Sequence, residues 1–89
     1  MPSEDSIVRA IARIAGRDYS KWTIGVTDYP KRRKSEHGNP RVWHNWNANT
    51  EKVARRIESR FINRGMKGGG GGPGNADYVY IFARSPLRR

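Results

Sequence analysis

The chain has 89 residues, and its 18 Lys and Arg outnumber its 8 Asp and Glu, which gives a formal net charge of +10. This length excludes a multidomain enzyme, and the lack of cysteine excludes disulfides, thiolate metal sites, iron–sulfur clusters and a cysteine nucleophile. The charge surplus predicts a polyanionic partner, most often nucleic acid, rather than a protein that is only soluble and basic.

Neither a membrane helix nor a targeting segment is visible. No apolar run approaches the roughly 20 residues of a membrane span, and the acidic start Met1–Asp5 is not followed by a signal peptide pattern. We therefore expect one cytoplasmic domain over residues 1–89 without membrane contact. Within it, residues 66–76 read as a glycine-rich loop and residues 84–89 as a basic tail.

The first predicted element is a helix over residues 3–16. Ser3 can cap its N-terminus, acidic side chains occupy the first turn, and Gly16 suits its C-terminal end. Its apolar stripe recurs at helical spacing and comprises Ile7, Ile11 and Ile14.

The next segments predict a strand and a short basic helix. Residues 21–27 alternate, which places Trp22, Ile24 and Val26 on one face and Thr23, Gly25 and Thr27 on the other. Pro30 is suited to the first helical position, so a helix should run from Lys31 to His37 and stop at Gly38-Asn39-Pro40.

The second half predicts another strand, helix and strand. Residues 41–46 read as the strand, a helix begins near Glu51 and ends by Gly65, and residues 78–82 form the last strand. The resulting order is helix, strand, helix, strand, helix, strand. The expected fold class is α/β (α+β), a small three-stranded sheet flanked by about three helices.

Glu58 is the first candidate for chemistry. On the predicted third helix its neighbours at i−4, i+3 and i+4 are apolar: Ala54, Phe61 and Ile62. A carboxylate there is costly if it is buried without a partner. The alternative is a structural ion pair with Arg55 or with a cation from another element.

A basic cluster after the first strand is the second candidate. Arg33 and His37 are four positions apart, so they share one face of a helix. Arg33 could bind a phosphate bidentately, and His37 could transfer a proton near neutral pH. The alternative is a solvated basic turn whose His favours the helix C-terminus.

The glycine run and two tryptophans could contact a ligand, but each also has a purely structural interpretation. The glycines of residues 67–75 could let backbone N–H groups face an anion, or could form a connector that approaches the sheet closely. Trp43 and Trp46 could stack on unpaired bases, but a role in the core or at the edge of the fold is favoured for both. They face opposite sides of their strand.

Together, Thr23-Ile24-Gly25, Arg33, His37 and Glu58 resemble the GIY-YIG nuclease superfamily. In that family a strand ends in Tyr-Ile-Gly, an Arg follows on a short helix, a His often follows the Arg, and a later helix carries a metal-ligating Glu. The eight positions from Gly25 to Arg33 and the four from Arg33 to His37 match the family's spacing. The close match spans residues 23–37.

The chain departs from the family at two points. Thr23 replaces the tyrosine of Tyr-Ile-Gly, which helps to activate or position the attacking water in the family. The family's first strand, Gly-Ile-Tyr, should precede this segment, where a helix is predicted instead. A circular permutation would supply the missing strand from residues 78–82, beside residues 22–27. Tyr78 is then the nearest match to the Gly-Ile-Tyr tyrosine, and Tyr80, on the same face, is the other candidate.

The resemblance implies metal-dependent phosphodiester hydrolysis. Mg²⁺ or Mn²⁺ would bind Glu58, Arg33 would neutralise phosphoryl charge, and Tyr78 or His37 would orient or deprotonate water. The partner would be nucleic acid, DNA rather than RNA, with flanking phosphates held by Lys31, Arg32, Lys34 and Arg41. Two alternatives stay open, a non-catalytic nucleic-acid-binding module on the same fold and a small basic structural or assembly protein.

Overall fold

The computed structural model describes residues 3–69 and 75–83, so residues 70–74 of the glycine-rich segment and the basic tail lie outside the described residues. The described elements follow in chain order as α1 (Glu4–Ala15), η1 (Tyr19–Lys21), β1 (Trp22–Thr27), α2 (Pro30–Glu36), β2 (Val42–Asn47), α3 (Glu51–Asn63), β3 (Lys67–Gly68) and β4 (Tyr78–Ala83). Among these residues no helix is both long enough and apolar enough to cross a membrane.

The three predicted α-helices form; α1 and α3 begin at capping side chains and carry apolar stripes, whereas α2 begins at Pro30 without a side-chain cap. The Ser3 hydroxyl accepts a hydrogen bond from the Ser6 N–H at 3.1 Å, and Thr50 caps α3 by accepting from the Val53 N–H at 3.1 Å. Gly16, which follows α1, has a φ of 70°, a conformation that glycine adopts without strain. The local sequence signals therefore set the helix boundaries to within a residue or two.

The sheet has four strands, in the order β2-β4-β1-β3, so the predicted three-stranded sheet is wrong in its strand number. The additional strand, β3, contains two residues and runs parallel to β1 at the sheet edge. It begins the glycine-rich segment, where no alternating pattern of side chains could have predicted it. The 3₁₀ helix η1 also adds an element to the predicted order.

The last strand lies beside the first, which confirms the placement predicted for residues 78–82. β4 is antiparallel to β1 along its whole length, with Gly25 opposite Tyr80, and is also antiparallel to β2. The C-terminal strand therefore occupies an interior position of the sheet. Strands that are more than fifty positions apart in the sequence become direct neighbours.

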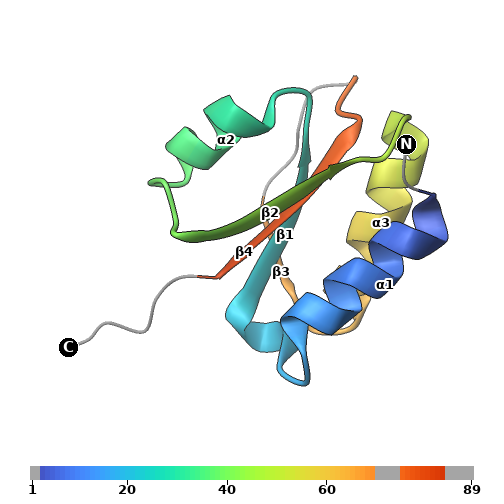
Figure 1. Ribbon diagram of the computed structural model, residues 1–89, viewed down its shortest axis with the longest axis vertical. Coiled ribbons are helices and arrows are strands. Elements are labelled where there is room, and N and C mark those ends of the chain that lie inside the picture. The colour runs from blue at the N-terminus through green and yellow to red at the C-terminus, as the bar shows by residue number, and fades with distance from the viewer. Residues whose placement is uncertain (1–2, 70–74, 84–89) are drawn as a thin grey trace.

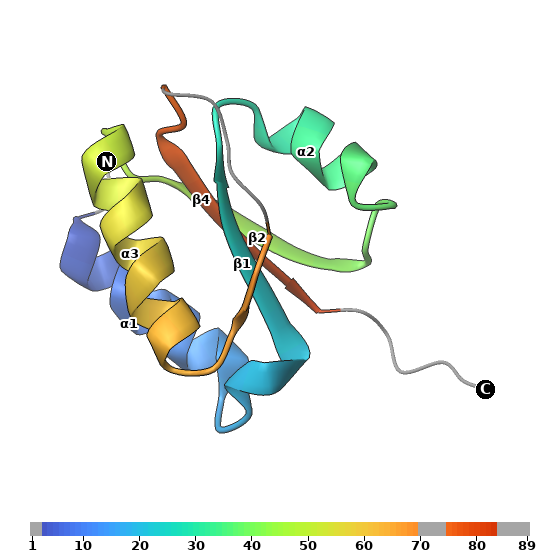
Figure 2. The ribbon, with the colours of Figure 1, turned by 180° about the vertical axis from the view of Figure 1, so that it is seen from behind.

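The two faces of the sheet carry different layers. α1 and α3 lie side by side on one face, and α2 lies on the other (Figures 1 and 2). The core fills the face under α1 and α3, where alternate strand residues such as Val79 and Ile81 point. It is completed from the two helices by Ile7, Ile11, Ala54, Ile57 and Phe61. The opposite face, under α2, receives the remaining β4 side chains and carries the candidate site.

Candidate functional site

The hydroxyl of Tyr80 is the meeting point of the site. The side chain comes from β4 and has no exposed surface. Its oxygen accepts a hydrogen bond from Arg33 Nε at 3.4 Å, lies 2.9 Å from His37 Nε2 and lies 3.3 Å from the carbonyl oxygen of Gly69. Burial raises the pKa of Tyr80, although Arg33 opposes this effect, so the phenol stays protonated at neutral pH. Its one proton can go to either His37 or Gly69.

Two glycines make room for this hydroxyl. A Cβ atom at Gly25 would lie 2.3 Å from the Tyr80 oxygen, and a Cβ at Gly69 would lie 2.5 Å from it. Both distances are shorter than any real carbon–oxygen contact. The Tyr80 ring thus crosses β1 directly over Gly25 and reaches the chain just beyond β3. This gives a physical reason for glycine at both positions.

Arg33 is held by three different acceptors. Besides Tyr80, its Nη1 donates to Glu36 Oε1 at 2.9 Å and its Nη2 donates to the Gly69 carbonyl at 3.0 Å. The hydrogen bonds to Tyr80 and Glu36 raise the pKa of Arg33. The side chain is 23% exposed, so part of the guanidinium faces solvent in a fixed orientation. All three guanidinium nitrogens already donate, and Glu36 is also the ion-pair partner of Arg33. A guanidinium has five N–H groups, so two are left to donate to phosphate oxygens.

His37 follows α2 directly, and its ring packs into an aromatic cluster. The ring centroids lie 4.7 Å from Phe82 and 5.6 Å from Tyr80. The spacing of Arg33 and His37 predicted that they share a helix face, and both indeed contact the same hydroxyl. His37 is only partly buried, so it combines a fixed ring with access to solvent.

Trp43, which sequence reasoning assigned to the core or the edge of the fold, covers Tyr80 from β2. The two rings stack at a centroid distance of 4.6 Å and an interplanar angle of 9°. Trp46 packs against the core on the other face of the same strand, so the two tryptophans face opposite sides, as the strand alternation predicted. The alternation within β2 shows that Trp43 and Trp46 lie on different faces. It cannot show that Trp43 stacks on Tyr80, because that contact depends on how β2 pairs with β4.

Glu58 is half-buried on α3 and makes no hydrogen bond or ion pair with another described residue. The alternative of an ion pair with Arg55 is not observed, because Arg55 donates to Glu51 at 2.7 Å, and no other Lys or Arg of the described residues lies within ion-pair distance of Glu58. Burial raises the pKa of the Glu58 carboxyl, and the positive charge of Arg55 partly opposes this. The charge of Glu58 also contributes to the raised pKa of Tyr80. However, α3 lies on the sheet face opposite α2 (Figures 1 and 2), and no hydrogen bond or ion pair among the described residues joins Glu58 to Arg33, His37 or Tyr80.

In the described part of the chain, no three His, Asp or Glu side chains gather as ligands of one metal ion. A single carboxylate nevertheless fits Mg²⁺, which keeps several water ligands and takes others from substrate phosphates. Glu58 has the chemistry for this role, since it is an acceptor-only group that is partly desolvated and lacks a cation within ion-pair distance among the described residues.

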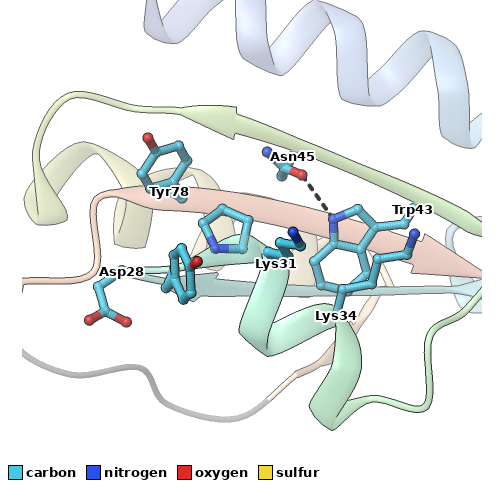
Figure 3. Close-up of a pocket in the computed structure, with 8 residues that line it drawn as sticks. Asp28, Lys31, Lys34, Trp43, Asn45 and Tyr78 are labelled. Carbon is cyan, nitrogen blue, oxygen red and sulfur yellow. Dashed lines mark hydrogen bonds between the residues drawn. The ribbon is translucent and has the colours of Figure 1, made fainter.

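Tyr78, the first choice for the catalytic tyrosine, lies apart from this cluster. It lines a cleft of about 450 Å³ at the N-terminal end of α2 (Figure 3). Two of the four predicted phosphate-binding cations, Lys31 and Lys34, line the same cleft. Arg32 is paired with Asp28 at 2.8 Å, and Arg41 is exposed between α2 and β2. The described structure therefore joins Arg33 and His37 to Tyr80 rather than to Tyr78.

Comparison with protein-family models, with curated proteins and with solved structures finds no match to this chain. What the protein does must therefore be inferred from its own residues and their geometry.

Proposed function

We propose that this protein is a metal-dependent nuclease that hydrolyses phosphodiester bonds in nucleic acid, on a circularly permuted relative of the GIY-YIG domain. The observation that carries the proposal is the meeting of Arg33, His37 and Tyr80 at one hydroxyl. Arg33 and Tyr80 are 47 positions apart, yet they are the residue types that the resemblance requires at one site. The antiparallel pairing of β4 with β1 supports the permutation.

Arg33 and His37 are the residues that contact the substrate and the attacking water. The Arg33 guanidinium binds the non-bridging oxygens of the scissile phosphate and neutralises the charge that develops on them. His37, whose ring is partly accessible, accepts the proton of the attacking water. Tyr80 is fully buried, so it does not reach the water and acts as a positioning residue that fixes both side chains.

Glu58 would hold the divalent cation, Mg²⁺ or Mn²⁺. When bound, such an ion supplies Lewis-acid polarisation of the phosphate and stabilises the leaving oxygen. The protein's own contribution is a carboxylate that is kept partly desolvated and out of ion pairs with the described cations. A group in this state gains more from a cation than an exposed carboxylate does.

The positively charged side chains on and after α2 would hold the phosphates on either side of the scissile bond. The preferred substrate is DNA rather than RNA. Lys31, Arg32 and Lys34 lie on α2, and Arg41 lies between α2 and β2, so binding should weaken steeply with salt. A cytoplasmic location fits such a partner.

A second candidate function is a nucleic-acid-binding module that has lost catalysis on the same fold. The observation that favours it is Thr23, which stands where the related nucleases have a tyrosine. The two functions differ in one respect that can be measured directly, because only the nuclease breaks phosphodiester bonds.

We expect the protein to nick supercoiled plasmid or a branched DNA when Mg²⁺ or Mn²⁺ is present and to leave both intact in chelator. Gel electrophoresis of the products measures this directly. Binding to the same DNA in chelator should persist, because the Lys and Arg side chains do not need the ion. Binding without cleavage under any divalent ion would instead support the non-catalytic module.

Replacing Arg33 by Lys should lower the cleavage rate by about 10²–10³-fold. Lysine keeps the charge, but a point charge cannot donate to Tyr80, Gly69 and a phosphate in the fork geometry of a guanidinium. Arg32→Lys is the matched control, because it makes the same change one position earlier, on a side chain paired with Asp28. Equal cleavage rates of the two variants in single-turnover assays would contradict the role of Arg33.

A further inference from the structure

The cleft beside α2 has no part in the proposed hydrolysis, yet aromatic, amide and ammonium side chains line it. Figure 3 shows Tyr78 and Trp43 at opposite ends, with Asn45 and Lys31 between them. Trp43 Nε1 donates to Asn45 Oδ1 at 2.9 Å, which fixes the amide and leaves its NH₂ group as the available donor. The cleft is completed by Asp28, Tyr29, Pro30 and Lys34.

We infer that this cleft binds an unpaired nucleobase of the substrate, next to the phosphate held by Arg33. The inference rests on the proposed function, and it narrows the substrate class to DNA with unpaired nucleotides, such as single strands, flaps or branches. Trp43 connects the two places, because its ring lines the cleft and also stacks on Tyr80 at the site.

The chemistry of the lining matches a base and its phosphates. Aromatic rings offer their faces for stacking, which every base can use. The ammonium groups of Lys31 and Lys34 can pair with the phosphates on either side. Asp28 is the one carboxylate among the lining residues, and its ion pair with Arg32 offsets its charge toward phosphate.

A base inside a duplex does not fit this lining. Its faces are covered by the neighbouring base pairs, so it could stack on Tyr78 or Trp43 only after it has left the helix. Leaving the helix costs least where the base is already unpaired. The cleft therefore favours unpaired nucleotides over duplex, with little selection among the four bases.

The experiment compares two strands that carry the same charge. A short oligothymidylate and an abasic oligomer of equal length are titrated with the protein in chelator, so that no cleavage occurs. We expect the oligothymidylate to bind about tenfold more tightly, the order of effect of stacking one base on an aromatic side chain. Tyr78→Ala should reduce this ratio to near one, while the hydrogen bonds of Tyr80 remain available.

Tryptophan fluorescence gives a second readout that does not depend on Tyr78. The oligothymidylate should quench the emission of the wild-type protein, and the quench should be lost in Trp43→Phe, which keeps a ring against Tyr80. Trp46→Phe is the matched control, since it makes the same change on the opposite face of β2, and it should keep the quench. Circular dichroism confirms that each variant is folded.

The outcomes separate this inference from the proposed function. Equal binding of the two oligomers, a preference that Tyr78→Ala leaves unchanged, or a quench that Trp43→Phe leaves unchanged overturns the base-binding cleft even if plasmid is cleaved. A preference that Tyr78→Ala removes, together with a quench that Trp43→Phe removes, supports the cleft even if no divalent ion brings about cleavage.

Discussion

Glu58→Gln is expected to lower the cleavage rate by about 10³-fold or more, the order of loss when a group that stabilises transition-state charge is removed. The same substitution is expected to raise the stability of the folded protein at neutral pH. Glutamine has nearly the same shape as glutamate, but it cannot bind a divalent cation as an anion does. Loss of activity together with a gain in stability is typical of a residue kept for function.

The gain in stability follows from the direction of the pKa shift. Burial raises the pKa of Glu58 in the folded chain above its value in the unfolded chain. As the pH rises between these two values, the unfolded chain loses its proton first, so the free energy of unfolding falls and stays lower at neutral pH. Glutamine does not titrate, so the variant avoids this loss. Below the ordinary range of carboxyl pKa values the difference between the two proteins should vanish.

Urea denaturation at neutral and at acidic pH measures the stability effect, and single-turnover cleavage measures the activity. Glu51→Gln is the matched control, because it makes the same change on the same helix, at a carboxylate that is paired with Arg55. It should lower stability slightly and leave cleavage within about threefold, because ion pairs that are partly exposed to solvent contribute little. A Glu58→Gln protein that cleaves like the wild type would exclude this carboxylate as the metal ligand.

Most of the fold could be predicted from local patterns. The apolar stripes of α1 and α3 and the alternation in β1 each reflect one buried face, which is a property of neighbouring residues alone. β3 could not be predicted in this way, because its two residues carry no pattern and its pairing with β1 depends on the whole sheet. The sheet therefore has one strand more than the periodicity indicates.

The site could be predicted only in part, because one of its residues depends on the register in which β4 pairs with β1. The spacing of Arg33 and His37 places them on one helix face whatever the rest of the chain does. Tyr78 and Tyr80 share one face of β4, and alternation cannot decide between them. The choice depends on which residue of β1 lies opposite, and the structure places Gly25 opposite Tyr80 and Thr27 opposite Tyr78. The signal that could have found Tyr80 is Gly25 itself, since only a missing Cβ leaves room for a ring to cross the strand.

Gly25→Ala is expected to destabilise the protein by about 2–3 kcal/mol and to disrupt the site, because it overpacks a buried position. The added Cβ would lie 2.3 Å from the Tyr80 oxygen and 2.5 Å from the ring carbon that carries it. Tyr80 cannot move away cheaply, since it is fully buried and is stacked on Trp43 at 4.6 Å. Chemical denaturation measures the loss, and Gly68→Ala is the matched control. That glycine lies on the neighbouring strand, and among the described residues its added Cβ would meet only Ile62, at an ordinary 3.5 Å.

A double-mutant cycle tests whether the Tyr80 ring is the cause. In a Tyr80→Leu background the shorter side chain leaves the space over Gly25 open, so the same Gly25→Ala change should cost less than about 1 kcal/mol. The coupling energy between the two positions should therefore be more than about 1 kcal/mol, as for residues in direct contact. If Gly25→Ala costs the same in both backgrounds, the glycine is required for the strand itself rather than for the tyrosine. The link between the Thr-Ile-Gly segment and the hydroxyl that positions Arg33 and His37 would then be lost.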